Sequence, residues 1–310
     1  MTEELVYLGP PGTFSEMAAL ALPGSVASQI HPAPSVMSAL GQVRAGSVAG
    51  AVVPIENSVE GSVSGTLDEL AAEPALRIAA EIAIPVRFVL MRRPGVTDES
   101  VAVVATHPHA AAQCRRWIHE NLPNADVAHT DSTADAAQRL AAERAPSFDA
   151  AIGTAAAAER YGLEVVASDI ADNREAETRF VKIVRPGPLP TVTGTDKTSL
   201  VLYIHANRAG ALLEILTELA TRDINMTRLE SRPTRHALGD YCFSVDLAGH
   251  VAEPQIGEAL IGLRRVCADV LFLGSYPRSS AQRLEVSSGR AQVDDRSDVE
   301  WLADIRSGKA

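Results

Sequence analysis

The sequence predicts an α/β protein built from a two-lobed N-terminal unit and a smaller C-terminal domain. Three observations predict this. Short apolar runs alternate with helical patterns from Leu5 to about Val184, a segment rich in proline and glycine follows, and strand and helix patterns then resume. Alternation of strand with helix is typical of a mostly parallel sheet. The 310 residues also exceed what one hydrophobic core usually serves, so more than one folding unit is expected.

The N-terminal unit, residues 1–185, is expected to pair each apolar run with a helix that follows it. The run from Glu81 to Arg93 is too long for one ordinary strand, and we expect it to pass between two lobes. The second lobe is expected at about residues 85–175, with a cleft between the lobes. The expected strands are LVYLG, AGAVVPI, VAVVATH, DVAHT, DAAIG and TRFVKIV, and the expected helices are 14 onward, 62–71, 108–120, 134–142 and 155–161.

The C-terminal third begins with a linker. Residues 185–196 hold three prolines and two glycines in twelve positions, which cannot sustain a helix or an interior strand. We place the linker at 186–196. Residues 197–277 then follow the order βαββαβ, with helices expected at 210–221 and 254–263, which predicts a ferredoxin-like domain. Residues 278–310 are polar and are expected to form a largely disordered tail.

Composition excludes several classes of partner and site. The formal net charge is −11, and no basic patch is interleaved with aromatics, so neither nucleic acid nor a membrane is an expected partner. No secretory signal and no run of eighteen apolar residues is present, which predicts a cytoplasmic protein. The three cysteines lack CxxC pairing and predict neither a disulfide framework nor a zinc site. An anion must therefore be bound locally, by a few side chains and backbone amides.

The segment GPPGTFS, residues 9–15, joins the first expected strand to the first expected helix. Its glycines permit a tight turn and close backbone approach. Thr13 and Ser15 lie where hydroxyls and free amides converge at a positive helix end, which favours a carboxylate site. The alternative is an ordinary strand-to-helix turn in which Ser or Thr only caps the helix.

The segment PIENS, residues 54–58, ends an apolar strand with three consecutive polar side chains, Glu56, Asn57 and Ser58. The carboxyl ends of strands are where open α/β sheets bind ligands, so these side chains are well placed for a substrate. The alternative interpretation is turn and capping chemistry.

The segment THPH, residues 106–109, with Gln113 further along, repeats this strand-end arrangement in the second lobe. His107 and His109 resemble metal ligands, but no carboxylate or cysteine lies at ligand spacing and a proline separates them, so no metal is expected. Cys114 precedes two arginines, yet cysteine at an alanine-rich helix position is typical of small core filler. We therefore expect no thiol nucleophile.

Thr178-Arg179-Phe180 opens the last strand before the linker, and this strand is expected to return to the first lobe. Arg179 can pair with a carboxylate through two N–H groups, and Thr178 can donate a hydrogen bond to a ligand hydroxyl. An ordinary edge strand is the alternative, and the tripeptide alone does not exclude it.

Five motifs taken in order, GPPGTFS, PIENSVEGSV, HPHAAAQC, AAIGT and TRF, resemble those of prephenate dehydratases. The resemblance covers residues 5–185 and implies a catalytic unit similar in fold to periplasmic binding proteins. Downstream, GAL at 210–212 and ESRP at 230–233 resemble the phenylalanine-binding elements of an ACT domain. Together the resemblances extend to about residue 277.

The resemblance implies decarboxylating dehydration of prephenate to phenylpyruvate, carbon dioxide and water in L-phenylalanine biosynthesis, without a cofactor. By similarity, Thr178 is nearest the departing hydroxyl. It either donates a proton or only orients the oxygen while a neighbour such as Glu56 donates through water. Asn57 and Gln113 complete the expected catalytic set. The expected substrate-binding residues are Thr13, Ser15, Ser58, Thr106, Arg179 as a carboxylate clamp, and Phe180 against the ring.

One departure from the family pattern concerns the residue two before Thr178. The family often has asparagine there, and this chain has Ala176. Either the loss of that amide shifts substrate affinity, or Asn173 substitutes for it from the preceding loop.

The regulatory domain is expected to bind L-phenylalanine between paired domains, which implies a homodimer or homotetramer. For Gly210 the alternative is simply a helix N-terminus. The expected effector-binding residues are Asn207, Ala209, Gly210, Ala211, Leu212, Glu230, Ser231, Arg232 and Pro233.

Two rival functions remain open at this point. One is arogenate dehydratase, which acts on the amino analogue of prephenate, because no single motif reports a keto oxygen against an amine. The other is a non-catalytic amino-acid sensor, since two lobes around a cleft also describe solute-binding proteins. The presence of Thr178 with Glu56, Asn57 and Gln113 favours an enzyme, because binding alone does not require that set.

Overall fold

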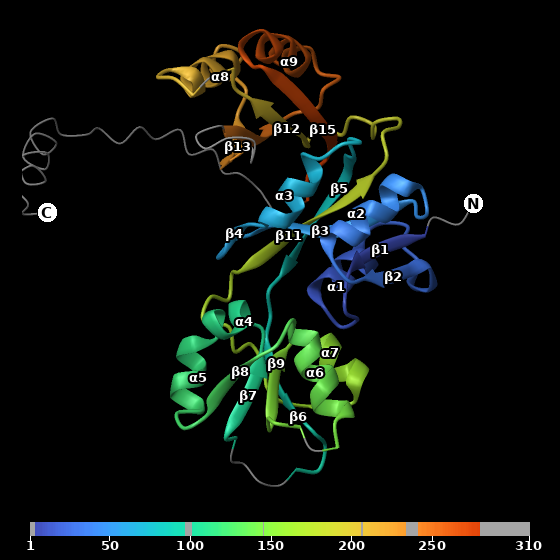
Figure 1. Cartoon of the computed structure of the whole chain (residues 1–310), viewed down its shortest axis with the longest axis vertical. Helices are drawn as coiled ribbons and strands as arrows, with labels where there is room; N and C mark the ends of the chain where they lie inside the picture. Colours follow the sequence, from blue (N-terminus) through green and yellow to red (C-terminus); the bar gives the residue numbers. More distant parts are fainter. Residues whose placement is uncertain (1–3, 97–100, 145, 206, 234–240, 280–310) are drawn as a thin grey trace, which may run out of the picture. The chain divides into compact units, whose positions relative to one another are not determined.

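The computed structural model describes residues 4–96, 101–144, 146–205, 207–233 and 241–279 (Figure 1). From residue 280 onward, the expected tail lies outside these ranges. Within them, no helix is both apolar enough and long enough to span a membrane. The predicted α/β class with two lobes and a βαββαβ domain is confirmed.

The first lobe is a six-stranded sheet in the order β2-β1-β3-β11-β5, with the short β4 on β3. β1 is parallel to β2 and β3, while β11 returns antiparallel between β3 and β5. The last strand before the linker thus lies inside the sheet and is not an edge. The elements are β1 Leu5–Leu8, α1 Phe14–Ala21, η1 Ala27–Gln29, β2 Ile30–Ala33, α2 Val36–Ala45, β3 Gly50–Asn57, β4 Gly61–Ser62, α3 Ser64–Leu70, β5 Arg77–Pro85 and β11 Glu177–Val184.

The second lobe is a five-stranded sheet in the order β10-β6-β9-β7-β8. The chain enters it directly after β5, and the two crossing segments meet where Val86 N–H donates to Ala176 O at 2.7 Å. The long apolar run therefore forms two strands, one in each lobe. The elements are β6 Val89–Arg92, β7 Val103–Thr106, α4 Pro108–Gln113, α5 Arg115–Asn121, β8 Asp126–His129, α6 Thr133–Ala142, β9 Ala150–Gly153, α7 Ala155–Tyr161 and β10 Glu164–Ala167.

The single helix predicted for residues 108–120 is wrong, because α4 ends at Gln113 and α5 begins at Arg115. The carboxylate of Asp172 causes the break. It accepts hydrogen bonds from the backbone N–H groups of Arg116 and Trp117, at 3.0 and 3.3 Å, and so starts a new helix. A residue 56 positions away in the chain supplies this cap, which local pattern does not reveal.

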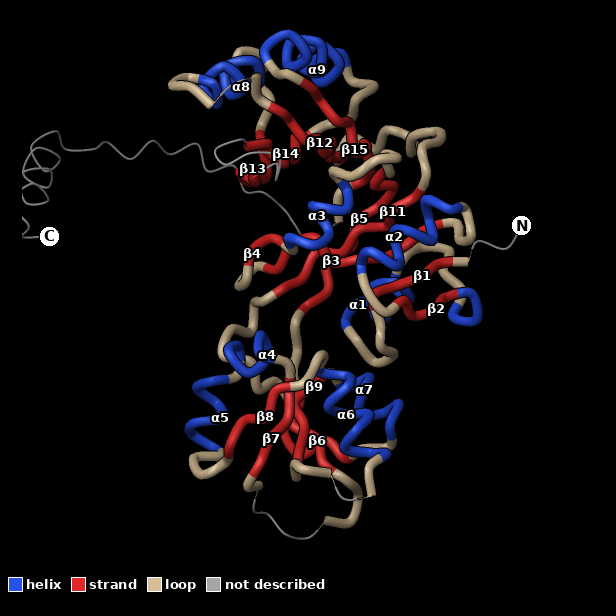
Figure 2. The backbone as a smooth tube through the Cα atoms, viewed as in Figure 1, coloured by secondary structure: helices blue, strands red, loops and turns tan. Residues whose placement is uncertain are grey.

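The C-terminal domain is an antiparallel sheet in the order β13-β14-β12-β15, and α8 and α9 cover one face (Figure 2). Residues 185–195 carry no helix or strand, and β12 already begins at Asp196, the last residue of the expected linker. The elements are β12 Asp196–Tyr203, α8 Ala211–Ala220, β13 Met226–Pro233, β14 Tyr241–Ala248, α9 Pro254–Val266 and β15 Asp269–Pro277.

The opposite face of this sheet shares a core with the first lobe. Because side chains alternate along a strand, Leu200 packs toward α8 and α9 whereas Val201 packs toward the first lobe. Val201 belongs to one cluster with Leu70 and Ile78. At Gly274 a Cβ atom would collide with the carbonyl oxygen of Ile78, so only glycine permits this approach of β15 to β5. Hydrophobic burial thus joins the two domains.

Candidate active site

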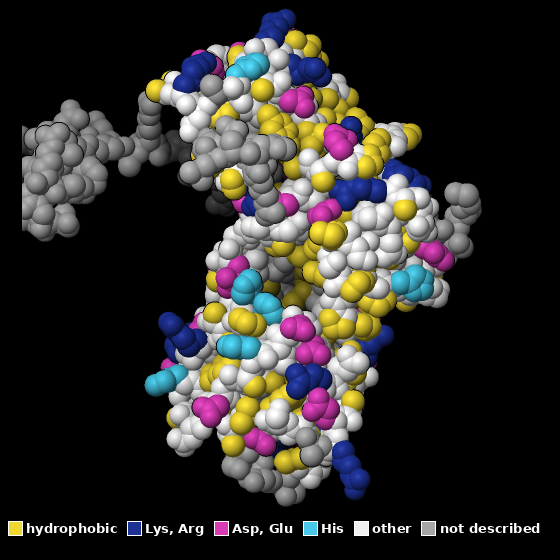
Figure 3. All heavy atoms as spheres, in the orientation of Figure 1, with side chains coloured by type: hydrophobic (Ala, Val, Ile, Leu, Met, Phe, Trp, Pro, Cys, Tyr) yellow, Lys and Arg dark blue, Asp and Glu magenta, His cyan; other side chains and the backbone are white. Residues whose placement is uncertain are grey.

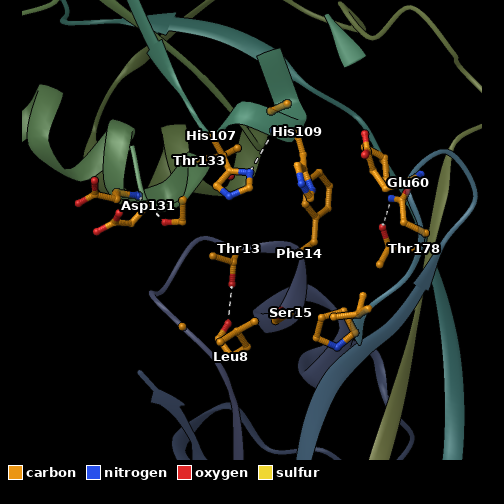
Figure 4. Close-up of a pocket in the computed structure, with 18 of the residues that line it drawn as sticks. Leu8, Thr13, Phe14, Ser15, Glu60, His107, His109, Asp131, Thr133 and Thr178 are labelled. Atoms are coloured by element: carbon orange, nitrogen blue, oxygen red, sulfur yellow. Dashed lines mark hydrogen bonds between the residues drawn. The ribbon is translucent and has the colours of Figure 1, made fainter. Parts of the chain in front are cut away.

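A cavity of about 930 Å³ opens between the two lobes. Figure 3 shows the surface hollowed there, and Figure 4 shows side chains of both lobes facing into it. The first lobe contributes the ends of β1 and β3, the start of the antiparallel β11, and the starts of α1 and α3, and the second contributes α4 and the segment that opens α6. Strand ends and helix starts therefore meet at one cleft, as expected for an open α/β sheet.

Thr178 and Asn57 form the polar centre of the cavity wall. They lie opposite each other on β11 and β3, and Asn57 Nδ2 donates to Thr178 Oγ1 at 2.8 Å. The Asn57 amide is itself oriented, because its Oδ1 accepts from the backbone N–H groups of Val59 and Glu60 at 2.8 and 3.0 Å. A hydroxyl that accepts one hydrogen bond still has its own proton to give. Thr178 is thus held as a donor toward the cavity.

The N-cap residue of α1, Thr13, and the first two residues of the helix, Phe14 and Ser15, face the same cavity (Figure 4). Thr13 Oγ1 accepts from Glu16 N–H at 3.4 Å and donates to Leu8 O at 3.3 Å, so this hydroxyl is largely occupied in capping α1. Ser15 is buried at the cavity wall. The capping interpretation therefore applies to Thr13, and a carboxylate site at Ser15 and the helix amides stays a prediction.

Gln113 faces the cavity from α4. Its Nε2 donates to Glu60 Oε1 at 3.3 Å, while its Oε1 is buried without a hydrogen-bond partner among the described residues. A buried amide oxygen that lacks a partner costs free energy unless a ligand or water donates to it. Gln113 is therefore suited to accept a hydrogen bond from a bound molecule.

Two histidines line the cavity at the start of α4, His107 as its N-cap residue and His109 in its first turn. Burial, together with the charges of His109 and His129, lowers the pKa of His107. His107 Nδ1 accepts from His109 N–H at 3.2 Å, which fits a neutral ring. The described residues contain no cluster of three or more His, Cys, Asp or Glu side chains that could hold a metal ion. Burial and the charge of Asp172 raise the pKa of Cys114 to about 12, so its thiol is not a nucleophile at neutral pH.

Arg179 and Glu56 lie on the opposite face of the sheet from Thr178 and Asn57. They pair with each other across β11 and β3, and period-two alternation directs both away from the cavity. Arg179 Nη1 contacts Glu56 Oε2 at 3.3 Å, and the guanidinium is 4% exposed. This placement conflicts with two predictions. One is that Arg179 binds a substrate carboxylate, and the other is that Glu56 supplies a proton to the substrate.

Three further expected substrate contacts also lie away from the cavity. Phe180 is buried in a cluster with Tyr7 and Ala18 beneath α1. Thr106 is fully buried, and its hydroxyl donates to Ile152 O at 2.8 Å. Ser58 instead holds the start of β11, because its Oγ accepts from Glu177 N–H at 2.9 Å. These side chains support the strands that form the site and do not line it.

Asn173 does not replace the missing family asparagine. Its Oδ1 accepts from Glu175 N–H at 2.9 Å, and it lines a separate surface cavity near Asp172. Ala176 is buried in the core of the second lobe.

Several cavity residues were not predicted. Glu60 lies in the quoted PIENSVEGS run, and Asp131, Ser132 and Thr133 follow β8. The strand-end rule applied to β8 would have found the last three. None of the described residues that line the cavity is lysine or arginine. An anion here meets hydroxyls, amides and helix N-termini, and it also faces the carboxylates of Glu60, Asp131 and Asp135.

The expected effector segments do not line a common cavity among the described residues of one chain. Gly210, at φ +87°, opens α8, and residues 207–210 are exposed. Residues 230–233 end β13, which lies at the edge of its sheet. A cavity of about 300 Å³ contains Arg232 and Pro233 but none of residues 207–212.

Comparison with known proteins assigns a family to each of the two domains. The family model described as prephenate dehydratase matches residues 5–187, and the ACT domain model matches residues 198–265. A prephenate dehydratase of Mycolicibacterium vanbaalenii is 46% identical over 98% of this chain and 99% of its own length. One of Amycolatopsis methanolica is 44% identical over 98% of both chains.

Two solved structures extend the comparison. The prephenate dehydratase of Arthrobacter aurescens in complex with L-Phe is 43% identical, with a TM-score of 0.86 over 98% of this chain and 99% of that one. A structure described as a novel type of quorum-quenching acylase is 32% identical, with a TM-score of 0.80 over 90% and 99%.

Proposed function

The chain belongs to the prephenate dehydratase family, and we propose that it converts prephenate to phenylpyruvate, carbon dioxide and water under feedback control by L-phenylalanine. The observation that carries the proposal is the Asn57–Thr178 hydrogen bond in the wall of the interlobe cavity. It supports a hydroxyl donor positioned for a leaving oxygen.

The reaction depends on a correctly positioned substrate and a proton donor more than on a reactive group of the protein. When the ring carboxylate leaves as carbon dioxide, its electron pair enters the ring and expels the hydroxyl, and aromatisation supplies driving force. A donor at the departing oxygen stabilises the charge that develops there. Thr178 Oγ–H fits this role, while Asn57 fixes its direction.

The cavity supports binding of a dianion without a cationic side chain. Two helix N-termini, one from each lobe, reach the cavity. Phe14 and Ser15 of α1 line it from the first lobe, and Ser132 and Thr133 at the start of α6 line it from the second. Backbone N–H groups at helix N-termini favour anions. Two such ends suit the two carboxylates of prephenate, with the apolar ring against Phe14 and Phe88.

The test of this function is phenylpyruvate formation by the purified, chelator-treated protein. Prephenate, arogenate and an N-acyl amide are offered in parallel, each with and without phenylalanine. We expect turnover of prephenate that falls when phenylalanine is added. Preference for arogenate would reassign the substrate. Cleavage of the acyl amide alone would favour the activity named for the 32%-identical structure. Phenylalanine binding without any turnover would indicate a sensor.

The proton donor is tested by a pair of carboxylate variants. Glu60 lies in the cavity beside Gln113, whereas Glu56 contacts Arg179 on the other face. If Glu60 supplies the proton, Glu60→Gln lowers kcat by about 10²-fold, the lower end of positioned proton transfer. Glu56→Gln serves as the matched control and is expected to stay within about twofold of wild type. Equal losses in the two variants would remove Glu60 from this role.

The same proposal includes a homodimer or homotetramer in the cytoplasm. The cavity that contains Arg232 and Pro233 is lined by none of residues 207–212, which supports an effector site completed by a second copy. The three cysteines are free and buried, which suits a reducing compartment. Light scattering after size-exclusion chromatography measures the mass, and a monomer at micromolar concentration with phenylalanine bound would contradict the paired site.

A further inference from the structure

We propose that Arg232 is a positioning residue that links strand β13 to the wall of the active cavity through Asp68 and Ser64, and that the phenylalanine signal passes through this contact. The inference deepens the proposed function and rests on its feedback half. It changes the role expected for Arg232, from a ligand of phenylalanine to a contact between the domains.

The guanidinium of Arg232 lies against helix α3 of the first lobe. Its Nη2 donates to Asp68 Oδ1 at 2.5 Å, and its Nη1 donates to Ser64 Oγ at 3.1 Å. The side chain is 12% exposed, so the contact is largely removed from solvent. Glu230, on the same strand, accepts from Nη1 at 3.0 Å. These bonds occupy both terminal nitrogens and leave little donor capacity for a ligand carboxylate.

The contact joins an expected effector-binding strand to the wall of the active cavity. Ser64, the first residue of α3, lines the active cavity, as does Val63 before it. Arg232 lies in β13 beside Ser231, another expected effector residue. A shift of β13 on ligand binding therefore pulls on Ser64, a cavity-lining residue, through the side chain of Arg232.

The contact has room to move. The cavity of about 300 Å³ borders it and is lined by Asp68, Arg232, Cys242 and Ser244. Close-packed interiors transmit strain but resist displacement, whereas a pair bordered by open volume can adopt a second arrangement. A cation beside a helix N-terminus is also disfavoured by the helix dipole, so Asp68 is needed to hold Arg232 there. Asp68 is therefore the side chain at which to break the link.

The neighbouring residue supplies a matched control. Glu69, also on α3, forms an ion pair with Arg44 of α2 at 2.7 Å, entirely within the first lobe. Its side chain is 18% exposed, against 28% for Asp68. Asp68→Asn and Glu69→Gln thus each remove one charge from the same helix, and only the first breaks the contact between domains.

The experiment measures two quantities on full-length wild type and on both variants. Prephenate turnover is followed with and without saturating phenylalanine, and phenylalanine binding is measured by calorimetry. We expect Asp68→Asn to bind phenylalanine within about threefold of wild type, while the inhibition at saturation falls at least about fivefold, the low end of allosteric coupling. Glu69→Gln keeps the wild-type response. Asp68→Glu, which retains the charge, keeps most of it.

Two outcomes would overturn the proposal. Full inhibition of Asp68→Asn would show that the signal takes another route. Loss of phenylalanine binding in Asp68→Asn, with its thermal unfolding unchanged, would make this contact part of the effector site itself. If wild type and Glu69→Gln also fail to respond to phenylalanine, the feedback half of the proposed function is wrong and the coupling role fails with it. That pattern differs from a failure confined to Asp68→Asn.

Discussion

Replacement of Thr178 by alanine is expected to lower kcat by about 10² to 10⁴-fold, because positioned donation to a leaving group contributes that much. KM for prephenate should change far less, since the hydroxyl acts where charge develops and one donor adds little to ground-state binding. The variant is expected to fold, because Thr178 loses only its hydrogen bond to Asn57 at the cavity wall.

Thr178→Ser is the control for this prediction. Serine keeps the hydroxyl and removes only a methyl group. The variant loses at most the packing of about one methylene-sized group, so kcat should remain within about tenfold of wild type. Steady-state kinetics on prephenate measures both variants. A kcat near the wild-type value for Thr178→Ala would exclude Thr178 from the chemical step.

The second large effect concerns stability. Asp246→Ala is expected to lower the free energy of unfolding by about 3–5 kcal/mol, because it removes the carboxylate that the buried guanidinium groups of Arg179 and Arg228 share. Asp246 is fully buried on β14 and contacts Arg179 Nη1 at 2.6 Å and Arg228 Nε at 3.0 Å. Ser199 Oγ donates to its other oxygen at 2.6 Å. The urea midpoint of unfolding measures the loss.

An exposed ion pair in the same domain controls for charge removal as such. Glu214 and Arg208 lie 2.7 Å apart with both side chains near half exposed, and Glu214→Ala should cost no more than about 1 kcal/mol. A similar cost for Asp246→Ala would show that the buried cluster contributes little.

The same carboxylate makes stability depend on pH. Burial alone raises the pKa of Asp246, but the charges of Arg179 and Arg228 outweigh it and hold that pKa well below its usual range. A carboxyl with a depressed pKa stabilises the fold above its unfolded value of about 3.9 and loses this contribution as pH falls. The gap in stability between wild type and Asp246→Ala should therefore narrow below about pH 4.

Alternation of apolar and polar runs was enough to predict the α/β class and the βαββαβ domain, because each follows from local periodicity. It did not reveal β2, α2 or β10. The break between α4 and α5 depends on Asp172, a residue far along the chain. Local patterns carry no information about such a partner.

The candidate site shows the same limit at the level of single side chains. Motifs identified Asn57, Gln113 and Thr178, all of which line the cavity. The adjacent residues Glu56 and Arg179 were expected to act with them, but strand alternation turns them to the other face. That alternation was available from the sequence. What it could not show is which face meets the cleft and which meets the second domain.

The core shared across β5 and β15 has a consequence for how the two domains evolve and can be engineered. A polypeptide cut at the linker would expose Leu70 and Ile78 to water and leave the Arg179 guanidinium without Asp246 and Tyr276. The regulatory domain is therefore not a detachable module. Substitutions on the faces of β12 and β15 that pack against the first lobe must be matched by substitutions in that lobe. An ACT domain transplanted from another protein would therefore bring no control unless the first-lobe residues that pack against it were transplanted as well.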